Sequence, residues 1–124
     1  MSFEQPNFKP SPFKAGADLT AAQFKGVVLT GALTVGAPSS AGVSIVGVLQ
    51  NKPNAGEACE IITSGISKAL AGAAIAVNAD VAMSNDGHFI TAVSGNVVVG
   101  TALEAAAASG EIVAVLLRNL GIKP

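Results

Sequence analysis

The sequence has few of the residues that active sites and nucleic-acid surfaces commonly use. Its 124 residues include one cysteine, one histidine, no tryptophan and no tyrosine, and only 12% of them are charged. A single Cys59 excludes a disulfide scaffold, and one cysteine with one histidine cannot supply the usual ligands of a zinc site. Seven basic side chains are balanced by eight acidic ones, so no basic excess is available for binding phosphates.

The chain is rich in small aliphatic residues instead. Half of its residues are hydrophobic, and all five aromatic residues are phenylalanines. This composition excludes intrinsic disorder, because disordered chains combine low hydrophobicity with high net charge. A domain of this size leaves much of its surface in contact with water. We therefore expect apolar surface that serves as an interface with other molecules.

The longest uncharged stretch, Gly26 to Asn51, has the length of a membrane span, which needs about 20 apolar residues. Five glycines and the sequence Pro38-Ser39-Ser40 interrupt it, however. Its Val- and Ile-rich segments favour a pair of strands joined by a loop over a transmembrane helix. The first residues lack the apolar run of a secretory signal. We expect no membrane association.

From residue 24 onward the pattern predicts short strands separated by turns. The tripeptide Asn85-Asp86-Gly87 is a strong hairpin signal, and Gly47 inside a strand indicates a bulge or a close backbone approach. Only residues 18–24 and 103–108 favour a helical turn. We predict an all-β domain over residues 24–124, a small sandwich or barrel. The expected strands span residues 24–30, 43–50, 57–64, 66–70, 81–84, 88–93, 97–103 and 112–118.

The first 23 residues differ from the rest of the chain. They hold three of the six prolines and three phenylalanines spaced by five residues. Proline favours extended backbone, and regularly spaced aromatic rings are suited to anchoring a chain on a partner. Residues 1–23 are therefore predicted to form an extended arm that docks on a partner or a neighbouring subunit; a disordered tail is the alternative. The candidate binding residues are Phe3, Phe8, Lys9, Phe13 and Lys14.

The residues offer little for catalysis. Ser84, Asp86 and His88 lie within five positions, but members of a catalytic triad normally come from separate parts of a fold. Cys59 lies on the more apolar side of an expected strand and is read as a small buried residue. Phosphate-binding, dinucleotide-binding and EF-hand motifs are absent from the sequence. We expect no enzymatic activity, no cofactor and no metal.

A series of short segments in a fixed order carries a resemblance to a known family. The segment VGTALEAA at residues 99–106 is the most specific, because it reads as a strand, a glycine and an Ala-Leu-Glu-Ala loop before a closing strand. Residues 47–50, 55–57, 71–75 and 109–113 add to it. Over roughly residues 24–118 the chain resembles the small capsid cement or decoration proteins of tailed bacteriophages.

This resemblance implies a structural virion protein that binds the outer surface of an icosahedral capsid and strengthens it, commonly as a trimer. The implied partners are the major capsid protein and further copies of the chain, with no nucleic acid and no membrane. The implied location is the outer capsid surface, after assembly in the host cytoplasm. Many relatives begin close to the first strand, so the longer N-terminal arm departs from the family pattern.

Two other functions stay open at this stage. Residues 65–83 faintly resemble biotinyl or lipoyl carrier domains, which present a modified lysine at a hairpin tip. Lys68 lies inside an expected strand instead, and Asn85-Asp86-Gly87 contains no lysine. A small ligand-binding barrel is the other alternative. The lack of tryptophan and tyrosine argues against a carbohydrate ligand, since sugars are usually stacked on aromatic rings.

Overall fold

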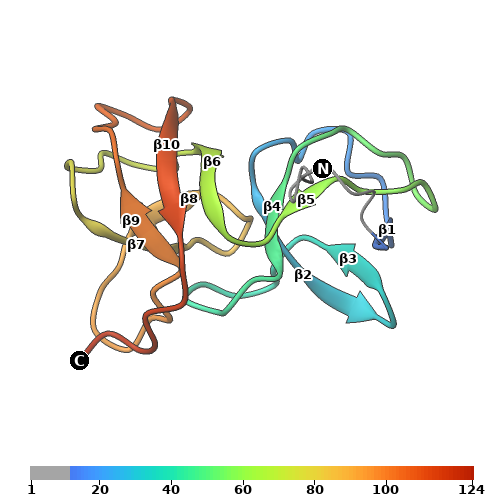
Figure 1. The fold of residues 1–124 in the computed structure, drawn as a ribbon, viewed down its shortest axis with the longest axis horizontal. Helices are drawn as coiled ribbons and strands as arrows, with labels where there is room; N and C mark the ends of the chain where they lie inside the picture. Colours follow the sequence, from blue (N-terminus) through green and yellow to red (C-terminus); the bar gives the residue numbers. More distant parts are fainter. Residues whose placement is uncertain (1–11) are drawn as a thin grey trace, which may run out of the picture.

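The computed structural model describes residues 12–124, which form ten strands and no helix. Two lobes lie side by side, each built on one five-stranded sheet (Figure 1). We call residues 12–62 the N-terminal lobe and residues 65–124 the C-terminal lobe. The all-β prediction is confirmed. Residues 18–24 and 103–108 form no helix, because so few residues cannot offset the cost of helix nucleation. The first segment keeps a single turn, in which the Ala22 amide donates to the Leu19 carbonyl at 3.0 Å.

The sheet of the N-terminal lobe closes on itself through its first strand. Lys14 bridges Ala58, and the amide of Ala15 donates to the carbonyl of Glu57 at 2.9 Å. Strand β1 therefore lies between β3, to which it is parallel, and the segment that precedes β5. The strand order is β1 (Lys14–Ala15), β3 (Thr34–Gly36), β2 (Gly26–Gly31), β4 (Gly47–Leu49) and β5 (Ile61–Ile62).

The sheet of the C-terminal lobe closes in a similar way. Ala71, which directly follows β6, forms a parallel bridge with Phe89 of β8. Phe89 and Met83 are the largest side chains that this closed sheet fully buries. The strand order is β6 (Gly65–Leu70), β10 (Ile112–Leu117), β9 (Gly100–Ala102), β7 (Asp80–Met83) and β8 (Phe89–Thr91).

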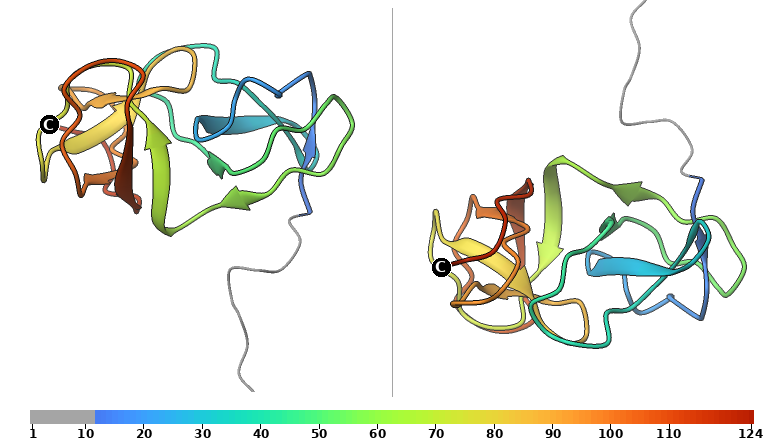
Figure 2. Two further views of the ribbon diagram at one scale, coloured as in Figure 1. Left: turned by 90° about the horizontal axis from the view of Figure 1, so that it is seen from above. Right: turned by 90° about the horizontal axis from the view of Figure 1, so that it is seen from below.

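The two lobes share core and hydrogen bonds. Val48 of β4 belongs to the hydrophobic core of the C-terminal lobe. The Gln50 side-chain amide donates to the Ser67 hydroxyl at 3.0 Å, and the Gly42 amide donates to the Met83 carbonyl at 2.8 Å. Both views in Figure 2 show the two lobes side by side. The lobes therefore pack as one body rather than as two linked domains.

The N-terminal boundary of the folded region differs from the one expected at residue 23. Ala15 and Leu19 are buried in the core of the N-terminal lobe, and Phe13 and Ala22 pack against it. The extended arm therefore does not reach residue 23, because these apolar side chains gain more from the core than from solvent. Residues 1–11 lie outside the described residues.

The uncharged stretch from residue 26 to 51 forms β2, β3 and β4, as expected for strands rather than a membrane helix. Strand β3 is additional to the predicted strands, since its three residues are too few for a periodic pattern. The strand expected over residues 57–64 shortens to β5. Among the described residues, no helix has the length and hydropathy needed to cross a membrane.

Gly47 confirms the close backbone approach predicted for it. A methyl group at this position would collide with the carbonyl oxygen of Ile62 on the neighbouring strand β5. Glycine at residue 47, which also lines the cleft between the lobes, thus lets β4 and β5 approach each other closely.

Candidate interaction surfaces

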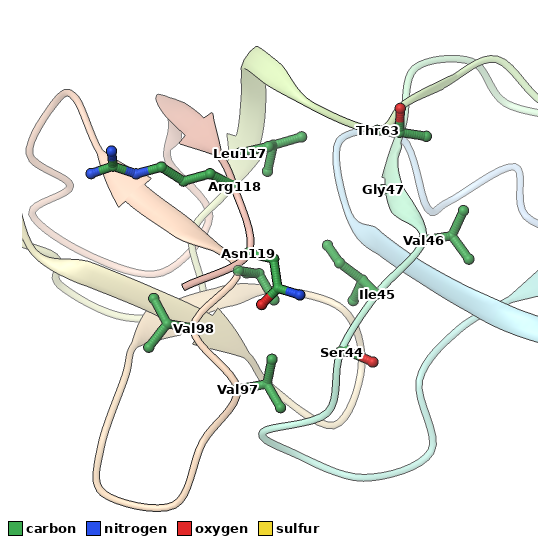
Figure 3. Close-up of a pocket in the computed structure, with 11 residues that line it drawn as sticks. Ser44, Ile45, Val46, Gly47, Thr63, Val97, Val98, Leu117, Arg118 and Asn119 are labelled. Carbon is green, nitrogen blue, oxygen red and sulfur yellow. The ribbon is translucent and has the colours of Figure 1, made fainter. Parts of the chain in front are cut away.

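The cleft between the lobes is small and mostly apolar (Figure 3). Its volume is about 90 Å³, below the roughly 300–1,000 Å³ of pockets that hold small-molecule ligands. Among residues 12–124, Arg118 is the one charged residue that lines it. Figure 3 shows this side chain extending away from Ile45, and its guanidinium donates to the Thr101 hydroxyl at 3.1 Å. The cleft therefore offers neither an acid–base pair nor room for a cofactor.

Ser84, Asp86 and His88 meet at the β7–β8 turn, but not in the order of a catalytic triad. The Asp86 carboxylate accepts from the Ser84 hydroxyl at 2.5 Å and from His88 Nδ1 at 2.7 Å. These two hydrogen bonds hold the pKa of Asp86 well below its usual range. The His88 ring does not bond to Ser84, so it cannot take the proton of that hydroxyl. The cluster stabilises a turn.

Cys59 is buried in the core of the N-terminal lobe. Burial raises the pKa of its thiol, because the low-polarity surroundings disfavour the thiolate. A protonated thiol enclosed by apolar side chains is a poor nucleophile and a poor metal ligand. Within residues 12–124, no three histidine, cysteine, aspartate or glutamate side chains gather as a metal site would require.

The candidate binding residues near the N-terminus fall into two groups. Phe3, Phe8 and Lys9 lie outside the described residues. Phe13 is half-buried against the core of the N-terminal lobe, and its carbonyl accepts from the Cys59 amide at 2.9 Å. Lys14 is exposed on β1. The structure thus makes Phe13 part of the folded lobe, whereas Lys14 faces solvent.

Exposed aliphatic side chains gather on two surfaces instead. The first, which we call the β6–β10 face, lies on the outer side of the C-terminal lobe, where Ile66 is 64% and Ile112 is 51% exposed. The second is the β2–β3 hairpin, whose tip exposes Leu29 and Leu33. Sequence reasoning missed both surfaces. The sequence IVAVLL of β10 carried a signal for the first, since a strand that is apolar on both faces is typical of two-sided burial.

The sequence matches the family model for phage cement proteins over residues 12–117. This chain belongs to the phage cement protein family. The match covers all ten strands and begins where the described residues begin. The cement protein is accordingly a structural protein of a phage capsid.

Among solved structures, the cement protein is similar to the N base of head fiber gp8.5 in bacteriophage phi29. The TM-score is 0.70, with 14% sequence identity, and the superposition covers 90% of this chain and 95% of the other. At that identity the likeness shows the shared fold, including its two lobes, and not a shared ligand. No curated protein matches the sequence.

Proposed function

We propose that this cement protein binds the outer surface of a phage capsid and stabilises the shell as a homotrimer, without catalytic activity. The observation that carries the proposal is the apolar β6–β10 face. A structural adhesive requires surface for its partners rather than a reactive group, and permanent interfaces resemble a protein core cut in half. The proposed location is the outer surface of the virion, reached after synthesis in the host cytoplasm.

On β6 the smaller side chains face the interior and the larger aliphatic side chains face outward, the opposite of the usual arrangement. Ser67 and Ala69, the smaller residues, point into the lobe, whereas Ile66 and Leu70 point outward. Cross-strand pairing extends this apolar row onto β10, because Ile66 lies opposite Leu116 and Leu70 lies opposite Ile112. A monomer would normally place its larger aliphatic side chains in the core. This arrangement supports a protein whose outer face is covered in its working state.

Covering the β6–β10 face would release a substantial free energy. Complete burial of an isoleucine side chain contributes about 1.5–3 kcal/mol, and Ile66 and Ile112 are both more than half exposed. Leu103 lies on the same face, beside Ala114 of β10. We assign this face to contacts between copies of the chain. Lys68 lies within the face and Glu104 lies beside it. Each copy can therefore offer one positive and one negative charge to its neighbour.

Contact with the shell is assigned to the N-terminal candidate residues. Phe3, Phe8 and Lys9 precede the folded lobe, and Lys14 is exposed at its beginning. In a trimer three such segments would act together, so that each contact could be weak while the whole binds tightly. The proposed interface involves the major capsid protein and other copies of the chain, and neither nucleic acid nor membrane.

A carrier function finds no support in the position of the lysine it would need. Lys68 is the fourth residue of the six-residue strand β6, and its ammonium lies 5.6 Å from the centre of the Phe24 ring. Carrier domains present their modified lysine at a hairpin tip, where an enzyme can reach it. A ligand-binding barrel is disfavoured by the small volume of the cleft between the lobes.

Two measurements test the proposal. Light scattering of the purified protein is expected to give three times the chain mass of 12.2 kDa, and sedimentation with phage heads that lack the protein is expected to show saturable binding.

Ile66→Glu should lower the mass toward that of the monomer. Val93→Glu is the matched control, because Val93 is 61% exposed in the same lobe and lies in the loop that follows β8. Absence of binding to heads would contradict the function, and a monomeric wild-type protein would contradict the trimer.

A further inference from the structure

We propose that the tip of the β2–β3 hairpin inserts its leucines into an uncharged, apolar pocket on the outer surface of the capsid. This inference rests on the proposed function and names a contact that the N-terminal residues do not supply. It is carried by three observations: the backbone conformation of Leu33, the exposure and lack of charge of the tip, and the point at which the chain enters the fold.

Leu33 occupies a backbone conformation that leucine rarely adopts. Its φ is 49°, in the left-handed region, and the pairing of β2 with β3 shifts its register between Leu29 and Gly31. Hairpins with such an irregularity usually place glycine or asparagine at the left-handed position, because a Cβ is disfavoured there. Leucine at this position is unfavourable for folding. Strained residues that are retained in a fold point to a function.

The hairpin tip also exposes large apolar side chains without any charge nearby in the sequence. Leu29 is 56% and Leu33 is 55% exposed. No charged residue occurs between Lys25 and Lys52, so β2, β3 and the turn between them are uncharged. Inserting the leucines would therefore desolvate no ion of the hairpin itself. The leucines of the tip are therefore suited to an apolar pocket that carries no charge. The exposed Lys14 of the neighbouring strand β1 lies beside the tip, opposite Thr34.

The position of β1 favours the capsid, rather than a second copy of the chain, as the partner that the hairpin tip contacts. The Lys14 amide donates to the Leu33 carbonyl at 3.0 Å, so β1, the first strand of the described fold, lies beside the hairpin tip. The proposed shell contact of Lys14 is therefore next to the leucines. Figure 1 shows the hairpin at the edge of the N-terminal lobe, on the side away from β10 and the C-terminal lobe. A trimer contact on the β6–β10 face therefore leaves the hairpin and the exposed Lys14 free to meet the shell together.

Leu33→Asn separates docking from folding. Asparagine tolerates the left-handed conformation and removes the apolar side chain, so the urea midpoint of unfolding should stay the same or rise. Binding to heads that lack the protein should weaken at least tenfold in Kd. Leu29→Thr provides a second variant with ordinary strand geometry, and the same loss of binding is expected. The matched control is Val77→Asn, which changes a side chain that is 60% exposed in the other lobe and should bind as the wild type does.

Each outcome decides the inference. Stable Leu33→Asn and Leu29→Thr variants that bind heads as the wild type does would overturn the hairpin contact while leaving the cement function intact. A change in the solution mass of these variants would assign the hairpin to contacts between copies and overturn the capsid assignment. If the wild-type protein does not bind heads, the proposed function and this inference fail together. Weaker binding of both leucine variants, with an unchanged mass and an unchanged control, supports the inference.

Discussion

The amide of Gly26 donates a hydrogen bond to the carbonyl of Gly87, 2.9 Å away, and joins the two lobes at the β7–β8 turn. Gly87 has a φ of 90°, which favours glycine. In addition, a Cβ at this position would lie 2.8 Å from the Gly26 carbonyl oxygen. The turn that forms the hairpin of the C-terminal lobe is thus also part of the junction between the lobes.

Gly87→Ala should therefore destabilise the protein for two reasons, backbone strain and a collision across the junction. We expect a loss of about 1–3 kcal/mol in the free energy of unfolding, measured by urea denaturation. Gly95→Ala is the matched control, since Gly95 has a φ of 91° but open space around it. The control should lose only the strain contribution. Equal losses in the two variants would show that the junction contact contributes nothing.

Asp86→Asn should reduce the dependence of stability on acidic pH. The lowered pKa of Asp86 means that its ionised form stabilises the folded state. This contribution is complete above the pKa of the unfolded chain, about 3.9, and is lost as the pH falls below it. Urea midpoints measured between pH 5 and pH 2 should therefore converge for wild type and variant. Ser84→Ala, which removes one of the two hydrogen bonds, should show part of the effect; parallel curves would contradict the prediction.

Leu19→Ala tests whether the residues before β2 belong to the fold. Leu19 is buried in the core of the N-terminal lobe, so truncation should cost about 2–5 kcal/mol. Leu29→Ala makes the same chemical change at an exposed position and should alter stability by no more than about 0.5 kcal/mol. Denaturant titration of both variants gives the comparison. Similar effects of the two substitutions would place Leu19 outside the core.

The Cys59 thiol should react slowly with a disulfide reagent at pH 8 in the folded protein and rapidly in urea. Its burial limits access, and its raised pKa lowers the fraction of reactive thiolate. The absorbance change of the released chromophore measures the rate. Rapid reaction of the folded protein would contradict the buried position of this residue.

Much of the C-terminal lobe could be predicted from local pattern. The turn at Gly87 and the strand that becomes β10 carry their signals within a few consecutive residues. Strand β1 carries no such signal. Its two residues become a strand only because β3 and the segment before β5 lie on either side of it, and these partners come from distant parts of the chain.

The candidate sites also depend partly on local sequence and partly on contacts between distant parts of the chain. The sequence by itself determined the chemistry: one histidine, one cysteine, few charges and many aliphatic residues, with family segments in a recognisable order. Only the tertiary structure decided which aliphatic side chains remain outside. Ile66 and Val48 are both strand residues with branched side chains, yet Ile66 faces outward and Val48 is buried in the core of the opposite lobe. The physical reason is that exposure depends on sheet closure and lobe packing, which join residues far apart in the chain.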